Sequence, residues 1–130
     1  MMSYKDEFIQ AVKTKFSDET RKNINRETVA KQIRMYFRDL QSKLKSEIIY
    51  SSFDMNMTEE GYLLDVEITV GNQILSIKED KDGFTVTDSR LKIDFIYYKT
   101  FRMFSEVHKT EFTTELLDLY LKEIFEDKLN

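Results

Sequence analysis

Apolar side chains recur at two different periods along this chain, and the changes of period divide it into elements. At residues 4–16 and 29–44 they recur every three or four residues, which is typical of one face of an α-helix. From about residue 48 to residue 88 they alternate with polar side chains, as in half-buried strands. A helical period returns from about residue 113. This order predicts an α+β fold, with helices at both ends and an antiparallel sheet between them.

Two helices are predicted in the N-terminal third. The first covers about residues 3–16, and its apolar row consists of Tyr4, Phe8, Val12 and Phe16. The segments Ser17-Asp18 and Asn23-Ile24-Asn25 are expected to interrupt the helix, with Asn25 as the N-cap of a longer helix that ends near Glu47. The apolar stripe of that second helix consists of Val29, Ile33, Phe37, Leu40 and Leu44.

The three glycines of the chain all lie where a sheet would turn. Gly61, Gly71 and Gly83 separate alternating segments, and glycine supplies the positive φ that tight turns need. We therefore expect a four-stranded antiparallel meander over about residues 48–88. One face should be buried through Tyr62, Leu64, Val66, Ile68 and Val70, and the other should be wet through Leu63, Asp65, Glu67 and Thr69.

The C-terminal part is predicted to add one more helix and, before it, a further strand. Residues 89–110 fit both periods, and we favour a fifth strand over 91–98 followed by irregular or helical chain. A helix over about 113–128 can be capped by Thr113, and Phe112 can pack on Leu117 as a hydrophobic staple. This amphipathic helix should cover the apolar face of the sheet. We expect residues 1–130 to form a single α+β domain with four to five strands.

Composition narrows the class of protein. The chain has 130 residues, is 41% hydrophobic, and contains no Cys, no Pro and no Trp, which excludes a disulfide scaffold, a thiolate zinc domain and a cysteine-dependent enzyme. There is no apolar run of about 18 residues and the first residues are polar, so a cytoplasmic location without a membrane span is expected. Fourteen Lys stand against six Arg, a bias that suggests a low-GC Gram-positive bacterium or one of its phages.

Candidates for catalysis and metal binding are weak. His108 is the single histidine, and no serine stands in a nucleophile-elbow motif. Glu106 and Glu111 lie near His108, but a transition metal usually needs at least three protein ligands and often two imidazoles. The acidic turn 79–83 departs from a calcium loop, and no glycine-rich phosphate loop occurs. We therefore predict no enzyme activity, no cofactor and no metal.

Charge is divided unevenly between the two parts of the chain. Residues 1–47 carry a net charge of +4 and residues 48–130 a net charge of −8. At about 100° per residue, one side of the second helix gathers a basic face that consists of Lys31, Arg34, Arg38 and Lys45. This face could bind the backbone of a nucleic acid, which is our alternative function. The acidic remainder and the net charge of −4 make nucleic acid an unlikely partner.

Aromatic side chains are dense between residues 95 and 104. Tyr, Arg and Met are enriched in interface cores, and this stretch holds more large side chains than one buried face needs. The partner-binding candidates are Tyr97, Tyr98, Phe101, Arg102 and Phe104. This segment, the acidic strand face with Asp65 and Glu67, or both would contact another protein or a second copy of the chain.

The segment from Phe112 to Phe125, FTTELLDLYLKEIF, resembles the small uncharacterised proteins of Bacillus-type genomes. The resemblance implies a protein of about this length with amphipathic helices around a short sheet, and it implies no activity and no functional residue. Because all three glycines lie in the meander, little remains for a glycine-lined active-site loop. We therefore predict a non-enzymatic, cytoplasmic protein-interaction module, of a regulatory, immunity-like or phage-encoded inhibitory kind.

Overall fold

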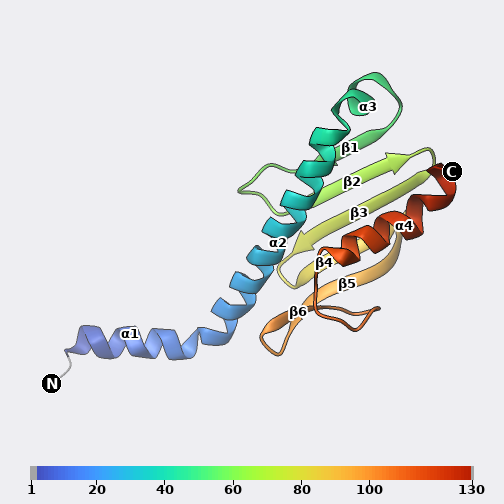
Figure 1. Ribbon diagram of the computed structural model, residues 1–130. Coiled ribbons are helices and arrows are strands. Elements are labelled where there is room, and N and C mark those ends of the chain that lie inside the picture. Colours follow the sequence, from blue (N-terminus) through green and yellow to red (C-terminus); the bar gives the residue numbers. More distant parts are fainter. Residues whose placement is uncertain (1–2, 130) are drawn as a thin grey trace.

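The computed structural model describes residues 3–129, which form four helices and six strands. In chain order these are α1 (Tyr4–Lys15), α2 (Ser17–Lys43), α3 (Lys45–Tyr50), β1 (Asp54–Met57), β2 (Asp65–Val70), β3 (Gln73–Asp80), β4 (Gly83–Asp88), β5 (Leu91–Lys99), β6 (Arg102–Ser105) and α4 (Glu115–Leu129). The strands form one antiparallel sheet in the order of the sequence (Figure 1). The α+β class, the meander and the C-terminal helix on the sheet are confirmed.

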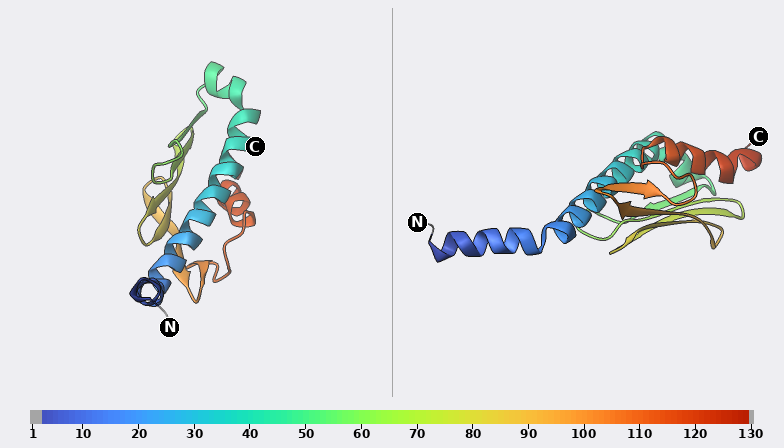
Figure 2. Two further views of the ribbon diagram at one scale, coloured as in Figure 1. Left: turned by 90° about the vertical axis from the view of Figure 1, so that its left-hand side faces the viewer. Right: turned by 90° about the horizontal axis from the view of Figure 1, so that it is seen from below.

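Both long helices cover the same face of the sheet. In the end-on view of Figure 2, α2 and α4 lie side by side on one side of the strands, and no described helix covers the other face. The alternation along β2 explains the choice of face, because Val66 and Ile68 are buried while Glu67 is exposed. The register continues the apolar row across the sheet, with Val66 opposite Ile77 and Ile77 opposite Val86.

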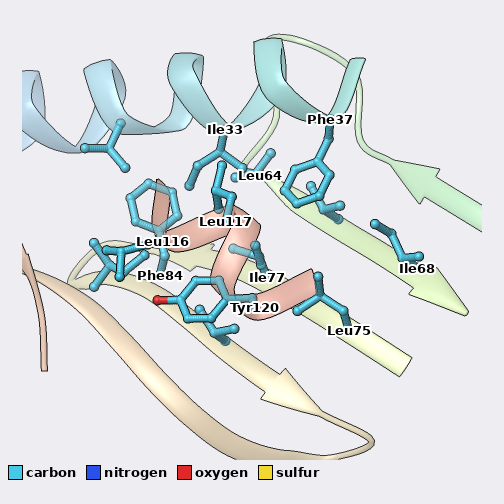
Figure 3. Packing of buried hydrophobic residues seen from close by; sticks show 14 of the residues in the cluster. Ile33, Phe37, Leu64, Ile68, Leu75, Ile77, Phe84, Leu116, Leu117 and Tyr120 are labelled. Atoms are coloured by element: carbon cyan, nitrogen blue, oxygen red, sulfur yellow. The ribbon is translucent and has the colours of Figure 1, made fainter. Parts of the chain in front are cut away.

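The core lies between the two helices and this covered face of the sheet. Ile33 and Phe37 extend from α2 into this core, and Leu117 and Tyr120 extend into it from α4, which lies beside α2 on the same face of the sheet (Figure 3). These four side chains are at most 1% exposed. The sheet is therefore held by two helices, and the sequence prediction assigned this covering role to the C-terminal helix.

One glycine is fixed by close packing as well as by its turn. Gly83 begins β4 with φ of 151°, and a Cβ atom there would lie 2.0 Å from the backbone oxygen of Ile96 in the neighbouring strand. No side chain fits that distance, so only glycine allows β4 and β5 to pair here.

The helical region differs from the prediction at its start and its end. α2 begins at Ser17 and runs through residues 23–25, so Asn25 is not an N-cap: its side-chain Nδ2 donates to the Arg21 carbonyl oxygen at 2.8 Å inside the helix. Asn costs a helix only a fraction of a kcal/mol, too little to break a long one. After α2, residues 45–50 form the short α3, which makes three N-terminal helices where two were predicted.

The sheet has six strands where four to five were predicted. The meander begins at Asp54 and not near residue 48, and β6 follows β5 in the stretch expected to be irregular or helical. The connecting turn is Thr100-Phe101, with φ of 50° and 66°, and the β4–β5 turn at Ser89-Arg90 also has positive φ. Because these turns contain no glycine, their residues gave no turn pattern in the sequence.

Candidate protein-interaction surface

The N-terminal helix α1 forms from local sequence and not from packing. Ser3 is its N-cap, and its Oγ accepts a hydrogen bond from the Asp6 backbone N–H at 3.3 Å. Acidic residues occupy the first turn and lysines the last turn, which suits the helix dipole. The helix ends at Phe16, whose φ of −103° and ψ of 10° separate it from α2. We call this helix together with its C-cap residue, residues 4–16, the α1 arm.

The apolar side of the α1 arm is uncovered. None of its residues is buried, and the arm projects away from the sheet at one end of the molecule (Figures 1 and 2). Tyr4 is 76% exposed and Phe8 56% exposed. The exposed large apolar side chains here, which we call the arm row, are Tyr4, Phe8, Ile9, Val12 and Phe16. Contiguous exposed apolar groups of this kind mark interaction surfaces in proteins.

Outside the arm, the exposed aromatic side chain of Phe101 lies beside the N-terminal half of α2. Phe101 stands at the tip of the β5–β6 hairpin and is 57% exposed. The guanidinium carbon of Arg21 lies 4.9 Å from the centre of its ring, within the range of a cation–π contact. A left-handed backbone is costly for Thr100 and Phe101, so the tip keeps this shape only because the paired strands impose it.

The structure distributes the predicted aromatic segment over three places. Tyr97 and Phe104 are cross-strand partners on the uncovered face of the sheet, since the alternate residue Ile96 is buried. Tyr98 packs against the core from the other face. Phe101 is at the hairpin tip, and the Arg102 guanidinium is 3.1 Å from the Glu111 carboxylate. These five residues therefore do not form one binding patch.

The predicted basic face is also divided. Lys31 and Arg38 are exposed, and Lys45 is exposed but belongs to α3. Arg34 is only 6% exposed: its guanidinium donates to the carbonyl oxygens of Thr58 and Tyr62, the latter at 2.8 Å. Arg34 is 60° around the helix from Phe37, at the margin of the apolar stripe, so it turns inward to hold the β1–β2 loop.

A hollow of about 520 Å³ lies between α2 and the β1–β2 loop. Its charged lining consists of Arg26, Lys31 and Arg34 and of Glu27, Glu60 and Glu79. Within it, the Arg26 Nε donates to the Glu79 carboxylate at 3.0 Å, and both side chains are mostly buried. Cations and carboxylates are equal in number, so the hollow has no net charge that would select an anionic or cationic ligand.

The uncovered sheet face carries mixed charge. Glu67 is exposed there, but Asp65 stands opposite Lys78 in the register, so the predicted acidic face is partly neutralised. Ser76 of β3 stands opposite Glu67, and its Oγ is buried without a hydrogen-bond partner in the described part of the chain. It lines a shallow hollow with Lys78 and Arg90.

A buried polar network, which sequence reasoning missed, joins β5, β6 and α4. The Asp94 carboxylate is 0% exposed and accepts from the Ser105 hydroxyl at 2.5 Å, from the Val107 N–H at 3.0 Å, and from the Tyr120 hydroxyl. Burial, followed by the bond to Asp94, raises the pKa of Tyr120. Closed to solvent and satisfied in its hydrogen bonds, the network fixes structure and offers no reacting group.

The carboxylates that the sequence placed near His108 form ion pairs on the surface. The carboxylates near His108 face cations, with Glu111 paired to Arg102 and Glu106 lying 3.9 Å from Lys92. Over residues 3–129, no group of three His, Cys, Asp or Glu side chains is placed to hold a metal ion. None of the described helices has the length and apolar character needed to cross a membrane.

No known protein family, no curated protein and no solved structure matches this chain.

Proposed function

We propose that this chain is a non-enzymatic protein-interaction module that binds its partner through the α1 arm. The observation that carries the proposal is the arm row, an apolar helix face whose residues are all exposed on a helix with no buried residue. A large apolar side chain contributes about 1.5–3 kcal/mol when it is fully buried. In the isolated chain these side chains stay in contact with water. Burying them against a partner would therefore stabilise the complex.

The predicted aromatic segment, the hollow beside α2 and the Asp94 network each offer less to a partner than the arm does. The predicted aromatic segment is divided between two faces of the sheet and a hairpin tip, and the hollow under α2 is balanced in charge. Phe101 lies against Arg21, a few residues beyond the end of the arm row, so the hairpin tip can extend the same surface. The buried network of Asp94 uses its polar groups internally.

The finer parts of the proposal come from composition and resemblance. We place the module in the cytoplasm of a low-GC bacterium or its phage, as a small regulatory, immunity-like or inhibitory protein. The absence of cysteine and the Lys-rich, Pro-free composition support this assignment. The alternative, binding of a nucleic-acid backbone by the basic face, has less support because Arg34 is buried under the β1–β2 loop and Lys45 is on a separate helix.

The experiment compares two charge-matched variants in an affinity capture from lysate. Phe8→Glu/Val12→Glu places two carboxylates in the arm row, and Gln10→Glu/Thr14→Glu places two on the opposite side of the same helix. We expect proteins captured by the natural chain to be lost with the first variant and kept with the second. Equal capture by all three forms would contradict binding through the arm row.

The same protein preparations test the alternative. A nucleic-acid binder would retard DNA or RNA with an affinity that falls steeply as salt rises, and Lys31→Glu/Arg38→Glu would weaken it. Both residues are exposed, so these substitutions leave the core intact. We expect no retardation at physiological salt.

A further inference from the structure

The arm row is suited to one particular occupant. Resting on the proposed function, we propose that the α1 arm binds the α1 arm of a second copy of this chain, with the two helices antiparallel. The protein would then be a dimer whose two sheet domains stand at opposite ends of a short helix pair. The proposal follows from the charges beside the row, the order of residues within it and the direction in which the arm projects.

The charges of the arm are complementary to those of an antiparallel copy. Asp6 and Glu7 are in the first turn, and Lys13 and Lys15 are in the last turn. At about 100° per residue, Asp6 and Lys13 lie beside the row on one side and Glu7 lies beside it on the other. Lys15 falls within the row, between the directions of Tyr4 and Phe8, in the half nearer to Glu7. An antiparallel copy therefore brings a lysine to each carboxylate on both sides. A parallel copy would place carboxylate beside carboxylate and lysine beside lysine.

The row itself is compatible with reversal. Its members at 4, 8, 12 and 16 are evenly spaced, so a copy running the other way about residue 10 superposes one set of positions on the other. Tyr4 then packs on Phe16 of the second copy, and Phe8 packs on Val12 of the second copy. The two outer contacts are then between aromatic side chains, and the two inner contacts are between Phe8 and Val12. The same reversal places Lys5 beside Lys15 of the second copy, and at about 100° per residue both lysines fall within the span of the row. This like-charge contact opposes the pair, whereas the contacts of Asp6 and Glu7 with lysines favour it.

The shape of the molecule leaves the arm free for this pairing. The arm runs away from the sheet domain, and its N-terminal end is the far end of the molecule (Figures 1 and 2). A second arm can therefore lie along it without the two domains meeting. Twelve residues give a helix only about 18 Å long. Such a pair covers less than a standard interface of about 1,600 Å², so we expect a reversible dimer with a micromolar dissociation constant.

Sedimentation equilibrium of the purified full chain, from about 1 μM to about 500 μM, tests whether the dimer exists. We expect the natural chain to pass from monomer to dimer over this range. Phe8→Glu/Val12→Glu should weaken association by about 100-fold or more, because two apolar contacts are lost per arm. Gln10→Glu/Thr14→Glu should leave it within about threefold. Thermal unfolding of all three forms checks that the fold is unchanged, as expected for exposed positions.

Cross-linking tests the direction of the arms, and the chain suits it because it has no cysteine of its own. Lys5→Cys and Lys15→Cys variants are oxidised separately and then as a mixture. In the antiparallel pair position 5 lies beside position 15, so the mixture should give the 5–15 disulfide-linked dimer and neither variant alone should cross-link efficiently. Efficient 5–5 and 15–15 products would overturn the antiparallel arrangement.

The outcomes separate this inference from the proposed function. A natural chain that stays monomeric up to about 500 μM would overturn self-association. If lysate capture still depended on Phe8 and Val12, the arm would bind a different protein and the proposed function would stand. If neither self-association nor capture depended on the arm row, both would fail.

Discussion

The first and last helices of this protein are both amphipathic, yet only one is part of the core. α1 has 12 residues and none is buried, whereas α4 has 15 residues and buries Leu116, Leu117, Tyr120, Ile124 and Phe125. Both have apolar side chains spaced three or four apart and acidic residues in the first turn. The difference is in what the rest of the chain brings to them. α4 follows the last strand and lies back across the sheet, while α1 extends from the end of α2, beyond the sheet.

The apolar face of an amphipathic helix predicts that some surface will cover it. It does not predict which surface that will be. For α4 that surface is the face of the sheet with Leu75, Ile77 and Phe84, as seen in Figure 3. For α1 the described residues provide none, and the helix depends on its Ser3 cap and its continuation into α2. The cost of a substitution should therefore be largest in the buried face of α4 and smallest in α1.

The largest effect should come from truncating the buried helix face. Leu117→Ala leaves a cavity among fully buried neighbours and should reduce the free energy of unfolding by about 2–5 kcal/mol. Urea denaturation followed by circular dichroism measures it. Leu119→Ala, on the exposed side of α4, is the control and should change stability by no more than about 0.5 kcal/mol. Equal costs at the two positions would mean that α4 is not packed as described.

A smaller effect should follow from removing the polar anchor of α4. Tyr120→Phe takes one donor from the buried Asp94 carboxylate and should cost about 1–3 kcal/mol at neutral pH. Ser105 and the Val107 N–H remain as donors, so the variant should still fold.

The same residue should make stability sensitive to alkali. The pKa of Tyr120 is raised in the folded state, so the folded chain keeps a proton that the unfolded chain releases above about pH 10. Its contribution is therefore complete below that pH and decreases as pH rises further. Urea midpoints between pH 8 and pH 11 should fall more steeply for the natural chain than for Tyr120→Phe. Parallel curves would contradict the assignment.

The contact between the two covering helices should contribute less. The Tyr36 hydroxyl of α2 donates to the Asp118 carboxylate of α4, and burial together with Asp118 raises the pKa of Tyr36. Because Asp118 is exposed, Tyr36→Phe should cost about 1 kcal/mol or less. A double-mutant cycle with Asp118→Asn isolates the pair, and a coupling free energy indistinguishable from zero would remove this bond from the account.

The smallest effect on the free energy of unfolding should be in the arm. Phe8→Ala removes a large side chain from a helix without buried residues, so the monomer should change by no more than about 0.5 kcal/mol. The measurement is made by urea denaturation at a protein concentration well below the dissociation constant, where the proposed dimer is dissociated. A cost near that of Leu117→Ala would show that Phe8 is covered within its own chain, and the contrast between α1 and α4 would be broken.

Parts of the fold followed from local pattern because local physics decides them. The alternation from Leu64 to Ile68 predicted the buried face of β2 correctly, and the row Tyr4 to Phe16 predicted α1 within a residue at each end. The strand β6 was missed because its turn at Thr100-Phe101 uses left-handed residues without glycine, a conformation that the paired strands impose. The prediction that a helix begins at Asn25 was wrong because the weak local preference of Asn for a cap does not break a helix of 27 residues.

The positions of the predicted binding residues followed less from the sequence than the fold did. The sequence identified α1 as amphipathic but assigned binding to the segment from Tyr97 to Phe104, whose aromatic density was the stronger pattern. That density proved to be divided among the core, the uncovered sheet face and the hairpin tip. Arg34 was grouped with exposed cations, although its position beside Phe37 at the stripe margin was visible in the helical spacing. Nothing local to Asp94 indicated that Tyr120 and Ser105 would meet it.

By itself, the sequence determined the α+β class, the amphipathic character of the helices and the buried face of the meander, because these depend on periods of a few residues. Only the tertiary structure decided which apolar faces are covered, since that depends on contacts between residues far apart in the chain. It covered α4 and left the α1 arm exposed, and it buried Asp94 and Arg34 by surrounding them with donors and acceptors from distant segments. The interaction proposed for this protein rests on that second kind of information.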